Sequence, residues 1–266
     1  MANSAERGRD IESGIRESSE AKRSWRVRDS ELNEPESKRD YNRKLFSIVA
    51  PKYDAITRLL SLGGDLLWKR RLIRLLPSDV PADLLDIATG TGDIAESLAE
   101  RYSDRRIHAL DLNPEMLARA RSRLRRFGAR TRALEADMAH MPFADGSMSV
   151  VTGGYALRNA PSLEAAVSEV ARVLEPGGTA VFLEFSRSAS PLLFAVQFRL
   201  LRLWGHFWGL LLHGDPEVYA YIARSLTRFP DRRRFHRMLA SYGLPVRYAP
   251  RLYFGVLELT VCRKAS

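Results

Sequence analysis

Two spacings of hydrophobic residues alternate along most of the chain. Short apolar runs with the length of buried strands occur at five places: 84–88, 106–110, around 134, 149–153 and 179–185. Between these runs, apolar residues recur every three or four positions, as on one face of a helix, at 93–102, 114–127 and 162–174. Strands that alternate with helices predict an α/β fold, in which helices cover both faces of a mostly parallel sheet.

The two ends of the folded part have other patterns. Residues 41–76 alternate apolar and basic positions at helical spacing, interrupted by Pro51 and by a glycine pair, which predicts several short helices. Residues 246–253 and 255–263 are predicted to form a closing antiparallel hairpin. With this hairpin, the sheet has seven strands.

Composition and charge separate the first 40 residues from the rest. Residues 1–40 contain only nine apolar side chains among charges of both signs, so we expect a disordered extension before a folded domain at 41–266. The extension has a net charge of −1, whereas the domain carries 33 basic against 22 acidic residues. A basic folded surface attracts phosphates, RNA or anionic lipid. The single cysteine, Cys262, excludes a disulfide scaffold and favours the cytoplasm.

The segment LLDIATGTGD carries the candidate chemistry. A buried strand leads to Asp86, and Gly90 and Gly92 then let the backbone approach a ligand closely. Asp111 ends the second strand, where a carboxylate accepts hydrogen bonds from ribose hydroxyls, and Asp137 follows the third strand. Because ligands of such sheets bind at the carboxyl ends of the strands, the spacing predicts a nucleoside site.

These motifs resemble those of class I S-adenosylmethionine-dependent methyltransferases, and among them the ubiquinone/menaquinone-biosynthesis C-methyltransferase family. The resemblance covers about residues 44–263 and implies a Rossmann-like fold. It is carried by FSIVAPKYDAITRLLSLGGDLLWKR (46–70), DIATGTGD (86–93), ALDLNPEML (109–117), ALRNAP (156–161), RVLEPGGTAVFLEFS (172–186) and YAYIARSLTRFPDRRRFHRMLASYG (219–243). The first and last blocks are specific to this family. The chain departs from its pattern at Gly154, where serine is common, and at Asp137 and Thr57, where asparagine is common.

The resemblance also implies roles for individual residues. The expected cofactor contacts are Asp86, Gly90, Thr91, Gly92, Asp111, Leu112, Asp137, Met138 and Gly154. The catalytic candidates are Arg158 and Asn159, after the fourth strand, and Tyr53 and Asp54, in lid helices at 41–76. A guanidinium keeps its proton in proteins, so we expect Arg158 to stabilise a phenolate rather than to act as a base. The alternatives are a surface arginine at this position and a helix N-cap at Asp54.

The apolar stretch at 191–213 lies in an expected lid or substrate insertion at 187–228. Arg199 and Arg202 near its middle would each cost roughly 2.5 to 3.5 kcal/mol on membrane insertion. Both arginines share one helical face with two histidines, which predicts an amphipathic helix and not a membrane span. This helix could pack on the core, form an apolar wall for an isoprenoid tail, or contact anionic lipid.

The implied activity is S-adenosylmethionine-dependent C-methylation of a polyprenyl quinol ring of the demethylmenaquinol or ubiquinol-precursor type. One alternative keeps the cofactor site and methylates oxygen, nitrogen or carbon of a secondary metabolite. A nucleic-acid methyltransferase is disfavoured, because GGYALRNAP lacks the Asn/Asp-Pro-Pro-aromatic loop of base-modifying enzymes. A third alternative is a cofactor-binding scaffold without turnover.

The partners expected from the sequence are therefore a lipophilic quinol and no nucleic acid. The five histidines lack ligand spacing, and no Cys/His cluster is present, so no metal site is expected. We expect the protein in the cytoplasm, with peripheral contact at the inner face of the membrane. The sequence does not decide between a monomer and a homodimer.

Overall fold

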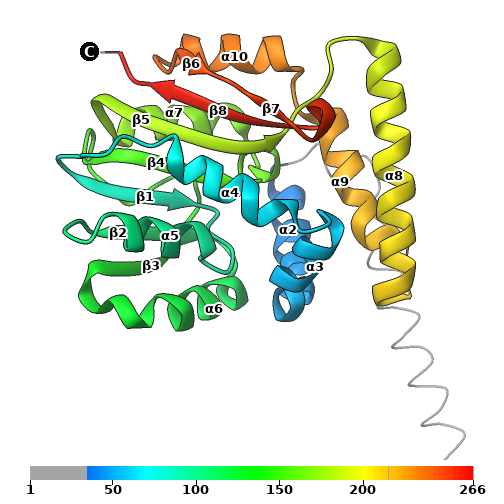
Figure 1. The fold of residues 1–266 in the computed structure, drawn as a ribbon, viewed down its shortest axis with the longest axis horizontal. Helices are drawn as coiled ribbons and strands as arrows, with labels where there is room; N and C mark the ends of the chain where they lie inside the picture. Colours follow the sequence, from blue (N-terminus) through cyan, green and yellow to red (C-terminus); the bar gives the residue numbers. More distant parts are fainter. Residues whose placement is uncertain (1–34, 215, 266) are drawn as a thin grey trace, which may run out of the picture.

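One sheet forms the centre of the computed structural model, which describes residues 35–214 and 216–265 (Figure 1). Its strands are β1 (Asp83–Ile87), β2 (Ile107–Asp111), β3 (Thr131–Glu135), β4 (Met148–Gly154), β5 (Leu174–Phe185), β6 (Val246–Tyr248), β7 (Arg251–Leu252) and β8 (Leu257–Arg263). The α-helices are α2 (Pro35–Val49), α3 (Tyr53–Leu60), α4 (Gly64–Arg74), α5 (Asp93–Arg101), α6 (Pro114–Leu124), α7 (Leu163–Val173), α8 (Pro191–His213), α9 (Glu217–Arg228) and α10 (Arg232–Ser241). Short 3-10 helices are η1 (Ala50–Lys52), η2 (Arg125–Arg130), η3 (Leu157–Asn159) and η4 (Tyr253–Gly255).

The strand order is β3-β2-β1-β4-β5-β8-β6, and β7 also pairs with β8. The first five strands of this order are mutually parallel, whereas β6, β7 and β8 are antiparallel to their partners. The predicted mostly parallel sheet with a closing hairpin is confirmed. The described residues form eight strands and not seven, because the first arm of the hairpin is divided at Ala249 and Pro250. Proline has no N–H for the strand ladder, and Pro250 instead accepts a hydrogen bond from the Leu259 N–H at 3.1 Å.

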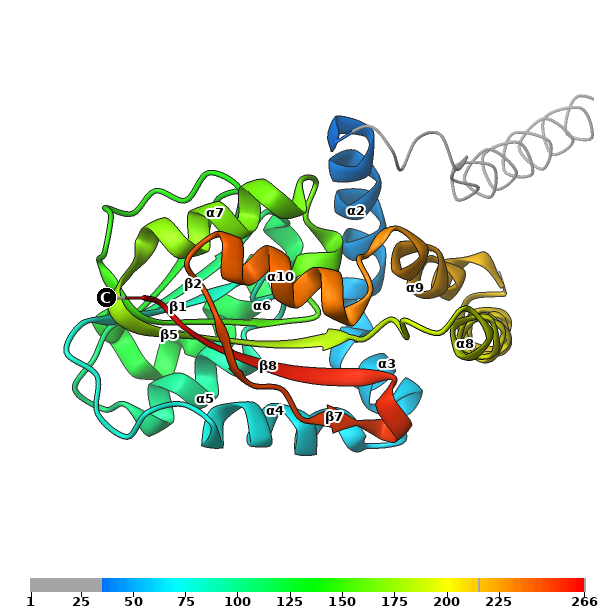
Figure 2. The ribbon, with the colours of Figure 1, turned by 90° about the horizontal axis from the view of Figure 1, so that it is seen from above.

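Helices cover both faces of the sheet, as the alternation of elements predicted. Leu84 and Leu85 are both fully buried, but they belong to different clusters because successive strand side chains point to opposite faces. Leu84 packs with α4 and α5, and Leu85 packs with α7 and α10. Figure 2 shows these two helical layers on opposite sides of the strands.

Several helix boundaries follow the local signals in the sequence. Asn113 caps α6 by accepting a hydrogen bond from the Met116 N–H at 2.9 Å, and a proline occupies the first turn. Ser162 caps α7 in the same way, by accepting from the Ala165 N–H at 3.2 Å. The prediction of several short helices at residues 41–76 agrees with α2, α3 and α4.

The N-terminal boundary differs from the expected one at residue 40. Helix α2 begins at Pro35, so residues 35–40 belong to a helix and not to the extension. The rest of the predicted extension, residues 1–34, lies outside the described residues.

A third apolar cluster lies beyond the carboxyl ends of the strands. It joins α2, α3 and α9 through Leu45, Val49, Ile56 and Tyr219. Helix α8 packs along α9 at this end of the molecule (Figure 1). Within the described part of the chain, no helix combines the length and apolar character needed to cross a bilayer.

Candidate functional site: two joined cavities

The turn between β1 and α5 depends on glycine at two positions. Gly90 and Gly92 have φ angles of +57° and +84°, which bulky side chains rarely adopt. A Cβ atom on Gly92 would also lie 3.0 Å from the Cβ atom of Ala120. The glycines therefore let the chain reverse tightly while α5 packs close to α6.

Asp111 connects this turn to the end of β2. Its carboxylate accepts hydrogen bonds from the backbone N–H groups of Gly90, at 2.7 Å, and Asn113, at 2.9 Å. Burial raises the pKa of Asp111, although hydrogen bonds from Asn113, Gly90 and Leu112 oppose the rise. The carboxylate is thus held in one orientation beside the pocket.

A narrow pocket of about 80 Å³ lies at the carboxyl ends of β1 to β4. Several of the predicted cofactor residues line it: Gly90, Asp111, Leu112, Asp137, Met138 and Gly154. Tyr53 and Asn159, predicted as catalytic, line the same pocket. A Cβ atom on Gly154 would lie 2.7 Å from the Ile94 Cδ1 atom, so the glycine that departs from the family pattern has a local packing reason.

Three predicted cofactor residues do not line this pocket: Asp86, Thr91 and Gly92. The buried Asp86 carboxylate accepts hydrogen bonds from the Thr89 hydroxyl at 2.6 Å and the Thr152 hydroxyl at 2.7 Å. Burial raises the pKa of Asp86 to about 7, against the effect of these two hydrogen bonds. Asp86 therefore supports the turn from beneath.

Asp54 supports the same turn from the lid. Its carboxylate accepts a hydrogen bond from the Thr91 hydroxyl at 2.6 Å and forms an ion pair with Arg123. Burial would raise the pKa of Asp54, but the bonds from Thr91 and Arg123 hold it below its usual value. The N-cap alternative is wrong, since Lys52 occupies the N-cap position of α3.

Helix α2 closes the open side of the pocket through contacts that the sequence did not predict. The Arg39 Nη2 atom lies 2.6 Å from the Asp137 Oδ2 atom. The Asn42 amide donates to the Asn159 carbonyl oxygen at 2.8 Å, and the Asn113 amide donates to the Arg43 carbonyl oxygen at 2.9 Å. These partners are separated by about 70 to 120 residues, so no local motif indicates them.

A second, apolar cavity of about 570 Å³ lies next to the pocket. Its wall combines side chains from α2, α3, α8, α9 and the β7–β8 connection, including Val49, Leu60, Leu201, Ile222 and Val256. The narrow pocket and this cavity share three wall residues: Phe46, Tyr53 and Tyr155. The two spaces are therefore neighbours separated by aromatic side chains.

Arg158 lies in the wall of the apolar cavity and is only 7% exposed, which excludes the surface-arginine alternative. Its Nη1 group donates to the Ser225 hydroxyl at 2.8 Å, and its Nε atom is 3.9 Å from the Glu184 Oε2 atom. The guanidinium also lies over the Phe185 ring, 5.0 Å from its centroid. Burial raises the pKa of Glu184 to about 7, although the Arg158 charge lowers it.

Glu184 and Ser225 are site residues that the sequence reading missed. Glu184 is buried in β5 and also accepts a hydrogen bond from the Leu157 N–H at 2.6 Å. A glutamate inside an otherwise apolar strand was an available signal, because such a charge needs a buried partner. Ser225 carried no comparable signal.

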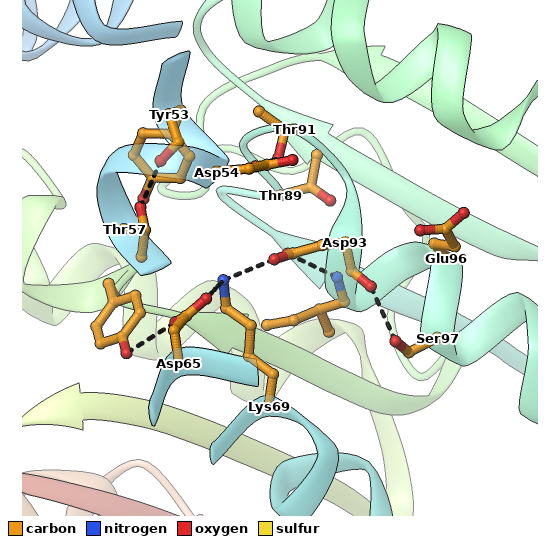
Figure 3. Close-up of polar contacts among 12 residues, drawn as sticks. Tyr53, Asp54, Thr57, Asp65, Lys69, Thr89, Thr91, Asp93, Glu96 and Ser97 are labelled. Atoms are coloured by element: carbon orange, nitrogen blue, oxygen red, sulfur yellow. Dashed lines mark hydrogen bonds and ion pairs between the residues drawn. The ribbon is translucent and has the colours of Figure 1, made fainter. Parts of the chain in front are cut away.

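A buried ionic network of Asp65, Lys69 and Asp93 (Figure 3) anchors the tyrosine that both cavities share, Tyr155. The Lys69 Nζ atom lies 2.8 Å from the Asp65 carboxylate and 2.7 Å from the Asp93 carboxylate. The Tyr155 hydroxyl donates to Asp65 at 3.0 Å. This network ties α4 to the first turn of α5 and fixes Tyr155, whose φ of +57° is rare for a bulky residue.

Both tyrosines between the cavities keep their protons at neutral pH. Burial raises the pKa of Tyr53 to about 12, and burial together with Asp65 raises the pKa of Tyr155 well above its usual value. They are hydrogen-bond donors and not bases. Among residues 35–214 and 216–265, no group of three or more His, Cys, Asp or Glu side chains is placed to hold a metal ion.

Solved structures of proteins described as methyltransferases share this fold. The putative methyltransferase complexed with the Haloferax volcanii Trm112 activator gives a TM-score of 0.59 at 18% identity, covering 83% of this chain and 98% of that chain. A geranyl diphosphate C-methyltransferase of Streptomyces coelicolor gives a TM-score of 0.57 at 15% identity, covering 75% of this chain and 78% of that one.

Sequence comparison is more specific. The chain is 40% identical over 220 residues to a demethylmenaquinone methyltransferase of Thermus thermophilus, covering 82% of this chain and 98% of the relative. It is 34% identical over 228 residues to the ubiquinone/menaquinone biosynthesis C-methyltransferase UbiE of Rubrivivax gelatinosus, covering 84% and 87%. A profile of the ubiE/COQ5 methyltransferase family matches residues 34–264. The chain therefore belongs to the ubiE/COQ5 methyltransferase family.

Proposed function

We propose that the protein transfers a methyl group from S-adenosylmethionine to a ring carbon of a polyprenyl quinol. The observation that carries this proposal is the junction of a narrow nucleoside-type pocket with a large apolar cavity across Phe46, Tyr53 and Tyr155. A reaction between a polar cofactor and a lipophilic acceptor needs two such spaces in contact. Positioning of the two reactants supplies much of the acceleration.

The residues of the narrow pocket fit an adenosyl group. The Asp111 carboxylate is oriented by two backbone N–H groups and has remaining lone pairs for ribose hydroxyls. Leu112, Ala136 and Met138 offer apolar surface for the adenine, and the absence of a side chain at Gly90 leaves room for close approach. When bound, S-adenosylmethionine supplies a methyl group on a positively charged sulfur.

The apolar cavity fits the acceptor. Its volume lies in the usual range of small-molecule sites, and its wall is largely aliphatic and aromatic. A quinol ring placed at the shared aromatic residues would leave the rest of the cavity for the isoprenoid tail.

Arg158 and Tyr53 are the groups that activate the acceptor in this proposal. Transfer of a hydroxyl proton to water makes the quinol ring electron-rich, and a buried guanidinium stabilises the resulting phenolate by a charge-assisted hydrogen bond. When the ring carbon takes the methyl group, the sulfur would leave as a neutral thioether, and the carbon would then release its own proton to water. Tyr53 donates a second hydrogen bond, because its high pKa keeps it protonated. Glu184 and Ser225 act as positioning residues, since they hold the guanidinium at the cavity wall.

Asn159 and Asp54 act by positioning in the same scheme. The Asn159 amide donates to the Tyr155 carbonyl oxygen at 2.8 Å, which braces the backbone between the two cavities. Asp54 fixes the glycine turn through Thr91. Neither residue is assigned the role of a base.

The proposal is tested with purified protein, methyl-labelled S-adenosylmethionine and a panel of acceptors. The panel contains a short-tailed demethylmenaquinol, a demethylubiquinol precursor and RNA. We expect label on a ring carbon of a reduced quinol and none on RNA. Cofactor binding with every quinol unlabelled would contradict the quinol assignment and favour another small-molecule acceptor.

Two further expectations belong to this proposal. A lipophilic acceptor is most concentrated in a bilayer, so we propose that the protein works in peripheral contact with a membrane. Self-association into a homodimer stays a prediction, which sedimentation of the full chain measures.

A further inference from the structure

The outward side of α8 presents a row of exposed apolar side chains. With 3.6 residues per turn, one side of the helix carries Leu192, Val196, Leu200, Leu203, Phe207 and Leu210. Leu192, in the first turn of α8, is 74% exposed, and Leu203, near the middle of the helix, is 66% exposed. A contiguous exposed patch of this kind marks an interaction surface.

Two turns add apolar side chains beside this row. Phe254 is fully exposed at η4, and Leu62 is 67% exposed in the turn between α3 and α4. Tyr253, Phe254 and Leu62 have φ angles of +47°, +55° and +51°, a conformation that such side chains rarely adopt. Backbone strain that holds large apolar groups in solvent indicates a function outside the folded core.

These parts lie together at one end of the molecule. Figures 1 and 2 both place α8, α3 and the turn after β7 on the side of the molecule at which the parallel strands end. The Trp204 indole N–H donates to the Leu60 carbonyl oxygen at 3.0 Å, which joins α8 to α3. The Trp68 and Tyr253 rings, with centroids 5.6 Å apart, join α4 to η4. We call the exposed apolar residues of α8, η4 and the α3–α4 turn the apolar end face.

The apolar cavity reaches this face. Leu200, Trp204 and Phe254 are exposed to solvent and also line the cavity. The mouth of the cavity is therefore rimmed by side chains of the apolar end face. An apolar ligand could pass between the face and the cavity without crossing water, provided that lipid covers the face.

The charges beside the apolar row of α8 favour an anionic surface as the partner that covers this row. Arg199 and Arg202 are exposed and lie along one side of the row, and α8 contains no Asp or Glu. Arginine side chains at the edge of an apolar helix face extend toward lipid headgroups while the apolar groups enter the acyl region. A second copy of α8 would bring further arginines without acidic partners on that helix.

We propose that the apolar end face inserts into the surface of an anionic lipid bilayer, so that the quinol enters the cavity from the lipid beside Phe254. This inference rests on the proposed function for its substrate, but the docking surface is testable without methyl transfer. It assigns the contact to particular residues and gives the protein one orientation on the membrane.

Vesicle sedimentation of the full chain tests the surface. The variant Leu203→Ser, Phe207→Ser, Leu210→Ser changes exposed residues outside the cavity wall. We expect the wild type to sediment with vesicles of phosphatidylcholine and phosphatidylglycerol, and the triple variant to bind at least roughly tenfold more weakly. Tyr248→Ser, at a half-exposed tyrosine on β6, is the matched control and should bind as the wild type does.

The charge contribution is measured separately. Arg199→Gln and Arg202→Gln should each weaken binding to these vesicles by on the order of fivefold. Neither substitution should change binding to pure phosphatidylcholine. An equal loss of binding to vesicles with and without phosphatidylglycerol would contradict the role of anionic lipid.

A probe at Phe254 tests insertion directly. Because Cys262 is buried and is the single cysteine of the chain, Phe254→Cys can be labelled with an environment-sensitive maleimide dye. Vesicles should shift its emission to the blue, whereas the same dye on Tyr248→Cys should not respond. Absence of a shift at residue 254 would overturn the proposed orientation.

Activity separates failure of this inference from failure of the proposed function. The triple variant should keep the wild-type rate with a water-soluble, short-tailed quinol and lose rate with a long-tailed quinol in vesicles. Vesicle binding without methylation of either quinol would support lipid binding by the apolar end face and contradict the proposed quinol methylation. Methylation without vesicle binding would contradict the proposal that the apolar end face binds lipid. A wild-type dimer that the triple variant converts to monomer would contradict it as well.

Discussion

The two cavities are built in different ways, although they share a wall. The narrow pocket is assembled at the ends of neighbouring strands, where short motifs supply Gly90, Asp111 and Asp137. The apolar cavity is assembled from helices and turns that come from both ends of the chain and lie outside the sheet. The strand-end part of the pocket is thus specified by a few local motifs, whereas its closure by α2 and the whole apolar cavity depend on the packing of distant segments.

Because the two cavities are built differently, substitutions in the pocket and in the apolar cavity should change different measured properties. Changes beneath or on the pocket wall should alter stability or cofactor affinity. Changes at the cavity wall should alter turnover of the acceptor.

Asp86→Asn should alter stability and leave cofactor affinity nearly unchanged. Burial raises the pKa of Asp86 from 3.8 to about 7, so the folded protein retains a proton that the unfolded chain releases between about pH 4 and 7. Stability therefore falls as pH rises through this window, by on the order of 4 kcal/mol for this group. Urea unfolding at several pH values should give a flatter profile for the variant. Burial also raises the pKa of Glu184, so part of the fall in stability with rising pH should remain in the variant.

A cofactor dissociation constant raised more than about tenfold in Asp86→Asn would contradict the supporting role and favour direct contact. Asp145→Asn, at an exposed carboxylate, is the control for the general effect of removing an acidic group.

Arg158→Gln should reduce kcat by roughly 10²- to 10³-fold, the usual effect of removing one donor to a developing oxyanion. Cofactor affinity should not change, because Arg158 lines the apolar cavity only. The single variant leaves the buried Glu184 without its charged partner, so unfolding is also expected to become easier. The double variant with Glu184→Gln should recover stability without recovering kcat. A double variant with near-normal turnover would show that the guanidinium is only structural.

Gly154→Ala should weaken cofactor binding and destabilise the fold by about 1 to 3 kcal/mol. The added Cβ atom would lie 2.7 Å from the Ile94 Cδ1 atom. Ile94→Val removes that atom, so the pair Gly154→Ala, Ile94→Val should regain most of the loss. Calorimetric titration with the cofactor and thermal unfolding measure the two effects. Failure of the second substitution to rescue the first would mean that another contact requires glycine.

Arg39→Ala should have the smallest effect, a severalfold change in cofactor affinity. Arg39 closes the narrow pocket through its ion pair with Asp137, and a partly exposed pair of this kind contributes about 1 kcal/mol or less. If cofactor binding displaces Arg39, the variant should bind more tightly and faster. Weaker binding would show that Arg39 contacts the cofactor.

The difference between the cavities also explains what the sequence could predict. The glycine turn and the strand-end acids depend on neighbours in the chain, and the structure has them where the motifs indicated. Residue roles were harder to predict than positions. Asp86 lies near the end of a strand as expected, yet strand side chains alternate between faces, and its carboxylate accepts a hydrogen bond from Thr152 instead of lining the pocket.

The parts that could not be predicted depend on distant contacts. Arg158 and Ser225 are 67 positions apart, and Arg39 and Asp137 are 98 positions apart. The apolar stretch at α8 predicted an amphipathic helix, but not which of its faces is exposed. That depends on how α8 packs along α9, which follows it in the chain.

In the proposed function, the apolar cavity receives the tail while the ring lies against the cofactor pocket. The direct test compares kcat/KM for one quinol head group with no tail and with one to three isoprene units. The comparison is made in solution, for the wild type and for Leu201→Trp, which narrows the cavity. We predict that kcat/KM of the wild type rises at least tenfold with the tail, and that Leu201→Trp removes this rise without changing cofactor affinity. Equal kcat/KM values for tailed and tailless quinols in the wild type would contradict the account.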